Sequence, residues 1–227
     1  MRERYTITID GPAGSGKSTA ARFLADRLGI VYLNSGALYR AVTYKTLQTG
    51  IDPADGQAVL GMLARTDITF VAGREGVRVV MDGSDVTDEI GSTRVTNQVH
   101  HVADNPLVRA AVGKLARRIV GEQSFVAEGR DQGTVVFPNA EVKFYLDASL
   151  TERARRRHAE LRAAGEEISA EEVETALRER DRGDMSRKVG TLRQADDATY
   201  VDNTELSVEE TVDLLRRKAL ERLGRDD

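Results

Sequence analysis

The sequence predicts an α/β fold in which a parallel sheet carries helices on both faces. Short apolar runs, typical of buried strands, alternate along the chain with longer segments that repeat apolar residues at helical spacing. A glycine-rich loop joins the first apolar run to the first of these helices. Between residues 67 and 90 the pattern changes to short alternating runs, which predict a small antiparallel sheet inserted into the core.

The first quarter of the chain is expected to hold two strands and three helices. The strands are predicted at 5–9 and 30–33, and the helices at 17–28, 37–47 and 53–65. Gly29 suits the position that follows the last residue of a helix. Asp52 and Pro53 are expected to serve as the N-cap and first residue of the third helix.

The rest of the chain continues the alternation of strands and helices. Strands are predicted at 68–71, 77–81, around Val86, and at 125–127, 142–147 and 198–201. Helices are predicted at 92–102, 106–120, 150–164, 170–180 and 208–223. Asp82 and Gly83 form a strong signal for a tight turn. In a parallel sheet of this kind, ligands bind at the carboxyl ends of the strands.

Residues 11–19 read GPAGSGKST and match the phosphate-binding loop G-x-x-x-x-G-K-[ST]. Its glycines are expected to take positive φ, so that successive N–H groups point toward an anion: Gly11, Gly14 and Gly16. The following helix adds its N-terminal dipole. Lys17 suits the β- and γ-phosphates, and the Ser18 hydroxyl can reach Mg²⁺. A simple glycine turn would need neither residue, so the loop predicts binding of a nucleoside triphosphate.

Composition excludes several other classes of protein. Of the 227 residues, 40% are hydrophobic and 31% are charged, which is typical of a soluble globular domain. The absence of cysteine excludes disulfides and thiolate catalysis and fits a cytoplasmic protein. We expect no membrane partner, because no apolar run is long enough and the chain starts without a signal-peptide pattern. The net charge of −4 argues against a nucleic-acid partner.

The phosphate-binding loop alone does not distinguish kinases from other nucleotide-binding proteins. A GTPase should carry a base-reading N-K-x-D sequence, which is absent here. Asp82 and Asp147 each follow a strand and could be mistaken for metal-binding acids. Turn or capping roles are the simpler interpretation of both residues.

Arginines at the ends of predicted elements favour phosphoryl transfer to a phosphate acceptor. Such arginines occur at Arg40, Arg109, Arg130, Arg180, Arg182 and Arg187. Two phosphates repel each other when brought together, and the planar guanidinium holds phosphate oxygens in pairs. Arg130, beside Gly129 at a strand end, is the strongest candidate. Another set is expected to lie on solvated helix faces with acidic partners: Arg153, Arg155, Arg157 and Arg162.

At this point the chain resembles bacterial cytidylate kinase, a family of P-loop nucleoside monophosphate kinases. The segments that carry the resemblance are GPAGSGKST (11–19), NSGALYRA (34–41), EGRDQGTVVFP (128–138), LDAS (146–149) and ERDRGDMSR (179–187). The resemblance implies a single kinase domain over 1–227. Its core would comprise 1–36, 104–150 and 196–227, with an acceptor-binding insertion at about 37–103 and a helical lid at about 151–190. It further implies Mg²⁺-dependent, in-line phosphoryl transfer from ATP to CMP or dCMP, giving CDP and dCDP.

The resemblance also implies roles for individual residues. ATP would bind Gly11, Pro12, Ala13, Gly14, Ser15, Gly16, Lys17, Ser18 and Thr19, with Ser18 as the metal ligand. CMP would contact Ser35, Tyr39, Arg40, His100, Arg109, Arg130, Asp131, Arg180, Asp184 and Arg187. The catalytic side chains would be Lys17, Arg130 and Arg187. Arg40 would meet the CMP phosphate, Arg180 and Asp184 would approach the ribose, and Asp131 could instead partner an arginine.

The chain departs from the family pattern at three places. His100 stands where a small hydroxyl residue is common near the cytosine. Gly183 and Thr191 replace an often bulkier residue and a frequent proline, so this stretch is expected to be more mobile. Asn203 departs mildly from an Asp-Thr-Thr-like run, a difference expected to matter little.

We expect the protein to be a monomer. Two alternatives to a cytidylate kinase remain open. The first is a small P-loop kinase with a different acceptor, such as UMP, AMP or a non-nucleotide alcohol. The second is a non-catalytic module that binds ATP and signals by closing. It would bind ATP without releasing ADP when an acceptor is added.

Overall fold

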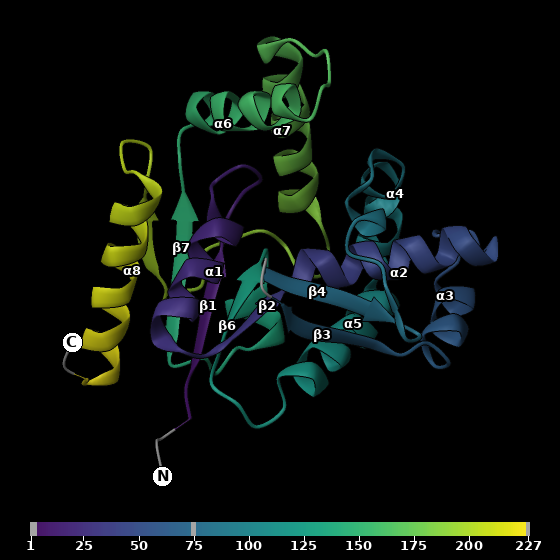
Figure 1. Ribbon diagram of the computed structural model, residues 1–227, viewed down its shortest axis with the longest axis horizontal. Coiled ribbons are helices and arrows are strands. Elements are labelled where there is room, and N and C mark those ends of the chain that lie inside the picture. The colour runs from purple at the N-terminus through teal and green to yellow at the C-terminus, as the bar shows by residue number, and fades with distance from the viewer. Residues whose placement is uncertain (1–3, 74–75, 226–227) are drawn as a thin grey trace. The chain divides into compact units, whose positions relative to one another are not determined.

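The computed structural model describes residues 4–73 and 76–225. The chain folds into two compact units, shown as a ribbon in Figure 1. The first unit comprises residues 1–32 and 123–227, and the second comprises residues 33–122.

The first unit is built around a five-stranded sheet with the strand order β2-β6-β1-β7-β8. Its strands are β1 (Thr6–Asp10), β6 (Phe125–Gly129), β7 (Val142–Asp147), β8 (Thr199–Asp202) and β2 (Val31–Asn34), whose last two residues belong to the second unit. Its helices are α1 (Lys17–Leu28), α6 (Leu150–Ala163), α7 (Ala170–Ser186) and α8 (Val208–Leu223). β1 pairs in parallel with β6 and β7, and β7 with β8. The predicted parallel sheet flanked by helices is confirmed.

One face of this sheet is covered by α1 and α8, which lie side by side against it (Figure 1). Ile7 and Ile9 alternate along β1 toward this face and are fully buried in a core with Leu24, Phe144 and Leu215. Because side chains alternate along a strand, the neighbouring residues of β1 point to the other face. The last of them, Asp10, leads directly into the glycine-rich loop.

Helices α6 and α7 pack on each other through Ala154, Val173 and Leu177. Both helices begin at a serine cap, Ser149 for α6 and Ser169 for α7. Helix α7 continues to Ser186 rather than ending near residue 180. The arginine-rich stretch that follows residue 178 is therefore largely helical.

The second unit combines helices with a small sheet. The helices are α2 (Ser35–Thr49), α3 (Gly56–Leu63), η1 (Glu89–Gly91), α4 (Thr93–Asp104) and α5 (Pro106–Val120). The predicted antiparallel sheet is confirmed as β3 (Ile68–Gly73), β4 (Gly76–Met81) and β5 (Ser84–Asp85). Asp82 and Gly83 form the expected tight turn, with φ of 49° and 82°.

The predicted start of the third helix is wrong. Asp55 caps α3, and its side chain accepts hydrogen bonds from the N–H groups of Gln57 and Ala58. Asp52 instead accepts from the N–H of Ala54, closing a local turn that contains Pro53. Either aspartate could cap a helix. Because Asp52 is used in the turn around Pro53, the helix begins later and Asp55 is its cap.

Across residues 4–73 and 76–225, no helix has both the length and the apolar character that crossing a membrane requires.

Candidate phosphoryl-transfer site

The glycine-rich loop joins β1 to α1 and uses its glycines in two ways. Gly14 and Gly16 have φ of 76° and 81°, a left-handed conformation that favours glycine. Gly11 does not have positive φ, so that prediction is wrong for this residue. A Cβ on Gly11 would lie 2.0 Å from the main-chain oxygen of Leu146. Gly11 is therefore required by the close approach of β7.

Lys17 is buried at the first position of α1, where its Nζ donates to the carbonyl of Pro12 over 3.0 Å. Burial is the main cause that lowers the pKa of Lys17 to about 7, and repulsion from Arg130 and Arg180 adds to it. Glu128 and Asp184 act in the opposite direction. The lysine thus lies where a bound polyphosphate would favour its charged form.

Ser18 contacts an acidic residue that the sequence analysis did not single out. Its hydroxyl donates to Oε1 of Glu128 over 2.9 Å, and Glu128 is buried. The parallel register places Glu128 opposite Ile9, near the end of the strand that enters the loop. The two oxygens are of the kind that Mg²⁺ prefers. The sequence indicates Glu128 only by placing an acidic residue directly after the apolar run 125–127.

A metal ion at this place would need ligands beyond the protein. In the part of the chain that the structure describes, no group of three or more His, Asp or Glu side chains is arranged to hold a metal ion. Mg²⁺ usually takes one or two protein oxygens and completes its shell with phosphate and water. Ser18 and Glu128 fit this pattern.

The two acids that resemble metal ligands in sequence are turn residues, as predicted. Asp82 accepts from the main-chain N–H of Asp67 and from Lys45. Asp147 accepts from the N–H of Ala148 directly after β7.

Three of the predicted site residues meet within the first unit. Oδ2 of Asp184 lies 2.7 Å from Nε of Arg130, and its Oδ1 lies 2.6 Å from Nη2 of Arg187. Burial alone would raise the pKa of Asp184, but the two arginines outweigh it and lower the pKa below its usual value. Arg180, one turn earlier on α7, is exposed and adds to the positive field. Asp184 therefore holds both proposed catalytic arginines.

The prediction that Arg153 lies on a solvated helix face is wrong. Arg153 is buried, and its Nη1 donates to the carbonyl of Ala13 over 2.9 Å and to Oδ2 of Asp181 over 2.5 Å. The other oxygen of Asp181 accepts from the N–H of Ala13 over 3.2 Å. Side chains of α6 and α7 thus hydrogen-bond both the N–H and the carbonyl group of Ala13.

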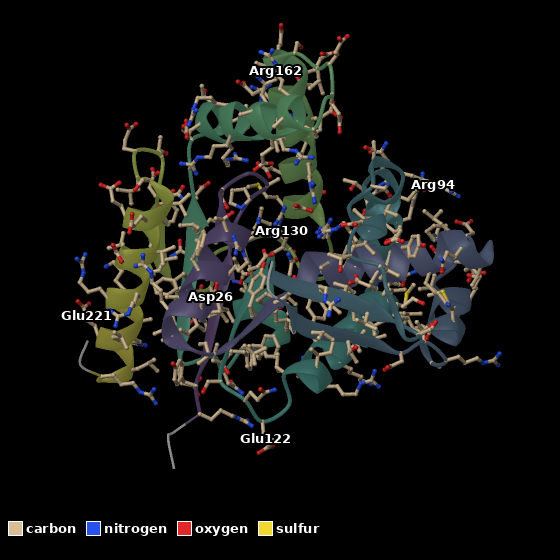
Figure 2. The ribbon with its side chains drawn as sticks, in the orientation of Figure 1. Asp26, Arg94, Glu122, Arg130, Arg162 and Glu221 are labelled. Atoms are coloured by element: carbon tan, nitrogen blue, oxygen red, sulfur yellow. The ribbon has the colours of Figure 1, made fainter. Side chains whose placement is uncertain are left out.

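The other three arginines predicted on solvated faces of α6 are exposed, as predicted: Arg155, Arg157 and Arg162. Arg155 pairs with Glu152 and Arg157 with Glu160, each within one helical turn. Figure 2 shows Arg162 at the outer end of the α6–α7 pair.

Asn203, a minor departure from the family pattern, contacts the glycine-rich loop directly. Its buried side-chain amide donates to the carbonyl of Ser15 over 3.0 Å. Its oxygen accepts from Nη1 of Arg156 over 3.1 Å. No local pattern indicates this contact, because Asn203 and Ser15 lie 188 residues apart in the chain.

The second unit holds several of the other predicted CMP residues. Ser35 is buried at the start of α2, and Tyr39 and Arg40 follow one turn later. The guanidinium of Arg109 on α5 lies 5.3 Å from the centre of the Tyr39 ring and donates to the carbonyl of Ala103. The structure therefore brings Tyr39 and Arg109 together.

His100 and Asp131 complete the predicted residues. His100 is exposed on α4, and its ring centre lies 3.9 Å from that of His101. Asp131 is buried in the first unit, just before a π-helix, η2 (Gln132–Val136), that was not predicted. Nε2 of Gln132 donates to Oδ1 of Asp131 over 3.4 Å. Roles in binding CMP remain predictions for both residues.

Comparison with known proteins agrees with this geometry. The family model for cytidylate kinase matches residues 7–221. A cytidylate kinase from Geobacillus kaustophilus is 46% identical over 99% of this chain and 100% of that protein. One from Carboxydothermus hydrogenoformans is 46% identical over 96% of this chain and 97% of that protein.

A solved structure shows the same fold. The crystal structure of an uncharacterized protein from Eubacterium ventriosum aligns with a TM-score of 0.50 and 11% identity, covering 95% of this chain and 98% of that chain. At this identity the likeness concerns the fold alone. The family model and the curated relatives identify the chain as a member of the cytidylate kinase family.

Proposed function

We propose that this enzyme transfers the γ-phosphoryl group of ATP to CMP and dCMP, giving CDP and dCDP. The observation that carries the proposal is the group formed by the glycine-rich loop, the buried Lys17 and the pair of arginines held by Asp184. The relatives that are 46% identical are named cytidylate kinases, which supports CMP as the acceptor.

The donor phosphates would lie on the main-chain N–H groups of residues 11–19, where the helix dipole and Lys17 offset their charge. Mg²⁺, when bound, would neutralise charge on the β- and γ-phosphates. Ser18 and Glu128 supply oxygens suited to hold it. Coordination of Mg²⁺ by Ser18 would therefore replace the present hydrogen bond to Glu128.

The acceptor phosphate would be held by arginine, with Arg40 as its main partner and Arg109 as a second. Arg130 and Arg187 would neutralise the charge that spreads over the transferred oxygens in the transition state. Positioning and charge neutralisation supply most of the rate, so no strong general base is required. Transfer is then direct and in line between the two phosphates.

The other residues have supporting roles in this proposal. Ser35, Tyr39, His100, Asp131 and Arg180 would contact the cytidine part of the acceptor. Residues at about 37–103 would form the acceptor-binding part of the kinase domain, and those at about 151–190 would form the lid. The lid role is supported by α6 and α7, which reach the loop through Ala13.

We further infer that the enzyme acts as a monomer in the cytoplasm, with nucleotides as its only partners. The net charge of −4 and the absence of cysteine support this inference.

The test is a coupled assay of ADP release with CMP, dCMP, UMP and AMP as acceptors. CMP and dCMP should give the highest kcat/KM, and Lys17→Met should abolish the signal with all acceptors. A strong preference for AMP would contradict the proposal. Binding of ATP with no acceptor-dependent ADP release would instead support a non-catalytic module.

A further inference from the structure

Asp10 is a buried acid that the reaction described above does not use. It is the last residue of β1 and directly precedes Gly11. Both of its carboxylate oxygens accept hydrogen bonds from main-chain N–H groups. Oδ1 accepts from Gln132 over 2.8 Å, and Oδ2 accepts from Gly133 over 2.7 Å. Asp10 is 4% exposed, so these bonds are shielded from water.

The two donors are the first residues of η2, which follows the segment with Arg130 and Asp131. On the other side of that segment, Gly129 is paired with Asp10 in the parallel ladder of β1 and β6. The backbone of Arg130 therefore runs between two points that are both fixed on Asp10. Asp184 holds the guanidinium of the same arginine.

Gly133 gives independent evidence that this turn lies tightly against β1. A Cβ on Gly133 would lie 2.8 Å from Oγ1 of Thr8, 3.2 Å from Cδ of Lys143 and 3.4 Å from Oδ2 of Asp10. The first of these distances is shorter than real Cβ contacts allow. The backbone approaches the strand so closely that only glycine fits.

We propose that Asp10 is a positioning residue for phosphoryl transfer, because its carboxylate fixes η2 on β1 and so sets the position of Arg130. The inference rests on the proposed function, in which Arg130 neutralises the transferred phosphoryl group. It links the residue before the donor loop to a catalytic arginine 120 positions away, counted from Asp10 to Arg130.

Charged groups from several elements surround Asp10. Lys17 of α1 lowers the pKa of Asp10 and Asp131 raises it, while Glu128 of β6 and Lys143 of β7 lie on the neighbouring strands. Burial is the largest cause and raises the pKa of Asp10 to about 7. The hydrogen bonds from the N–H groups of Gly133 and Gln132 lower the pKa but do not outweigh burial. Below this pH the carboxyl gains a proton and one oxygen becomes a donor that faces an N–H. Protonation thus changes the hydrogen bonds between Asp10 and η2, so the geometry of η2 on β1 is expected to shift as the pH falls through about 7.

The experiment compares the wild-type enzyme with Asp10→Asn and Gly133→Ala, and uses Asp197→Asn as the control. The Asp10→Asn substitution keeps the shape of the side chain but turns an NH₂ group toward an N–H donor. Asp197 is an exposed aspartate that accepts from the Lys143 ammonium, whereas Asp10 accepts from main-chain N–H groups of η2. The readouts are kcat and kcat/KM for CMP between about pH 5.5 and about pH 9, together with Kd for ATP and the melting temperature.

We expect Asp10→Asn and Gly133→Ala to lower kcat by ~10- to 100-fold at pH about 8, because an error of about 1 Å in a catalytic group has an effect of this size. Kd for ATP should change by less than ~3-fold, and Asp197→Asn should match the wild type. The ratio of wild-type to Asp10→Asn activity should fall toward one below pH about 6, because wild-type Asp10 is then protonated. Taking the ratio removes the titration of the CMP phosphate itself.

Wild-type kcat in Asp10→Asn would overturn the inference. A loss of activity that is the same at every pH and parallels a loss in melting temperature would also overturn it, because a purely structural role produces that result. Inactivity of the wild type on CMP would contradict the proposed function instead, and the two failures are thereby separated.

Discussion

Two buried ionisable residues lie at the glycine-rich loop, Asp10 directly before it and Lys17 within it. Burial lowers the pKa of Lys17 and raises the pKa of Asp10, in each case to about 7. Lys17 therefore resists charging in the nucleotide-free protein, since its folded pKa lies below the unfolded value. An anion at the loop reverses this preference. Protonation of Lys17 is thus coupled to the binding of an anion at the loop.

Proton uptake should accompany ATP binding at about pH 8. In the free protein Lys17 is largely neutral at this pH, and the donor phosphates raise its pKa, so each binding event should take up close to one proton. Isothermal titration calorimetry in Tris and in HEPES checks this, because the binding enthalpy then depends on the ionisation heat of the buffer. Lys17→Met should show no such dependence. Equal enthalpies in both buffers for the wild type would refute the coupling.

Replacing Arg40 by alanine should impair the acceptor side alone. The loss of a charge-assisted contact to the CMP phosphate is expected to reduce kcat/KM for CMP by about 2 kcal/mol, or ~30-fold, or more. Kd for ATP should stay within ~2-fold. Arg94→Ala is the matched control, because Arg94 is an exposed arginine on α4 of the same unit (Figure 2). Steady-state kinetics measures kcat/KM for CMP, and titration calorimetry measures Kd for ATP. If ATP binding weakened as much as kcat/KM fell, the assignment of Arg40 to the acceptor phosphate would be contradicted.

Sequence reasoning at this scale succeeds where the chemistry is local. Lys17 and Ser18 follow from one short motif, and their contacts lie beside it. Glu128 and Asn203 could not be found in this way, because each reaches the loop only through pairing or packing with distant segments. Gly11 was identified for the wrong physical reason, since the close approach of β7 depends on the sheet order.

At the scale of elements, α6 and α7 act as one body fixed to the loop by a buried ion pair. Arg153 of α6 and Asp181 of α7 bond to each other and to Ala13. The sequence predicted an end near residue 180, whereas α7 continues to Ser186. The helix persists because Asp181 and Asp184, one turn apart, are both buried on arginines. Tertiary contacts therefore override the local signal here.

Arg153→Ala should destabilise the enzyme strongly, because it leaves Asp181 buried without its partner. We expect a loss of about 3–5 kcal/mol, which corresponds to a melting temperature lower by about 6–20 °C. Arg155→Ala removes an exposed pair on the same helix and should leave the melting temperature within about 2 °C of the wild type. Thermal denaturation followed by circular dichroism distinguishes the two. Similar melting temperatures for both variants would show that the buried pair contributes little.

Two further failures in predicting elements have different causes. Asp52 and Asp55 both suit a helix cap, and the turn around Pro53 selects the second. The π-helix η2 has no sequence signal of its own, because its shape follows from the two N–H groups that Asp10 fixes. Strand and helix order, in contrast, follows from periodicity along the chain.

Gly11→Ala should disturb the junction of β1, β7 and the loop. The added methyl group would meet the carbonyl of Leu146 at 2.0 Å, so the backbone must move. We expect Kd for ATP to rise by ~10-fold or more. Gly61→Ala is the control. Apart from its chain neighbours and the backbone of its own helix, no described atom lies within 4 Å of its Cβ position, and alanine in α3 should stabilise by up to ~1 kcal/mol. Nucleotide titration of both variants tests this, and unchanged affinity in Gly11→Ala would contradict it.

At the scale of the whole molecule, the chain is divided by its own contacts into two units, the second of which interrupts the first. The parallel sheet and the inserted antiparallel sheet were both predictable, because each has its own period of apolar residues. The exposed large apolar residues among those described come from separate elements, for example Phe23 of α1, Leu107 of α5 and Val208 of α8. Single exposed apolar residues are normal on monomers.

We accordingly expect a monomer in solution. Light scattering coupled to size-exclusion chromatography should give a mass near 24.9 kDa. The result should not change with a reducing agent, because the chain has no cysteine. A mass twice as large that persists on dilution would contradict this expectation.

The central strand β1 is synthesised first but acquires its neighbours late. Tyr5 bonds to Ser124 and Thr6 to Glu141, across separations of 119 and 135 residues. While the ribosome is still making the second unit, the apolar residues of β1 have no sheet to join. A nascent chain that stops before β7 contains every residue of the glycine-rich loop, yet it cannot form the support on which that loop depends.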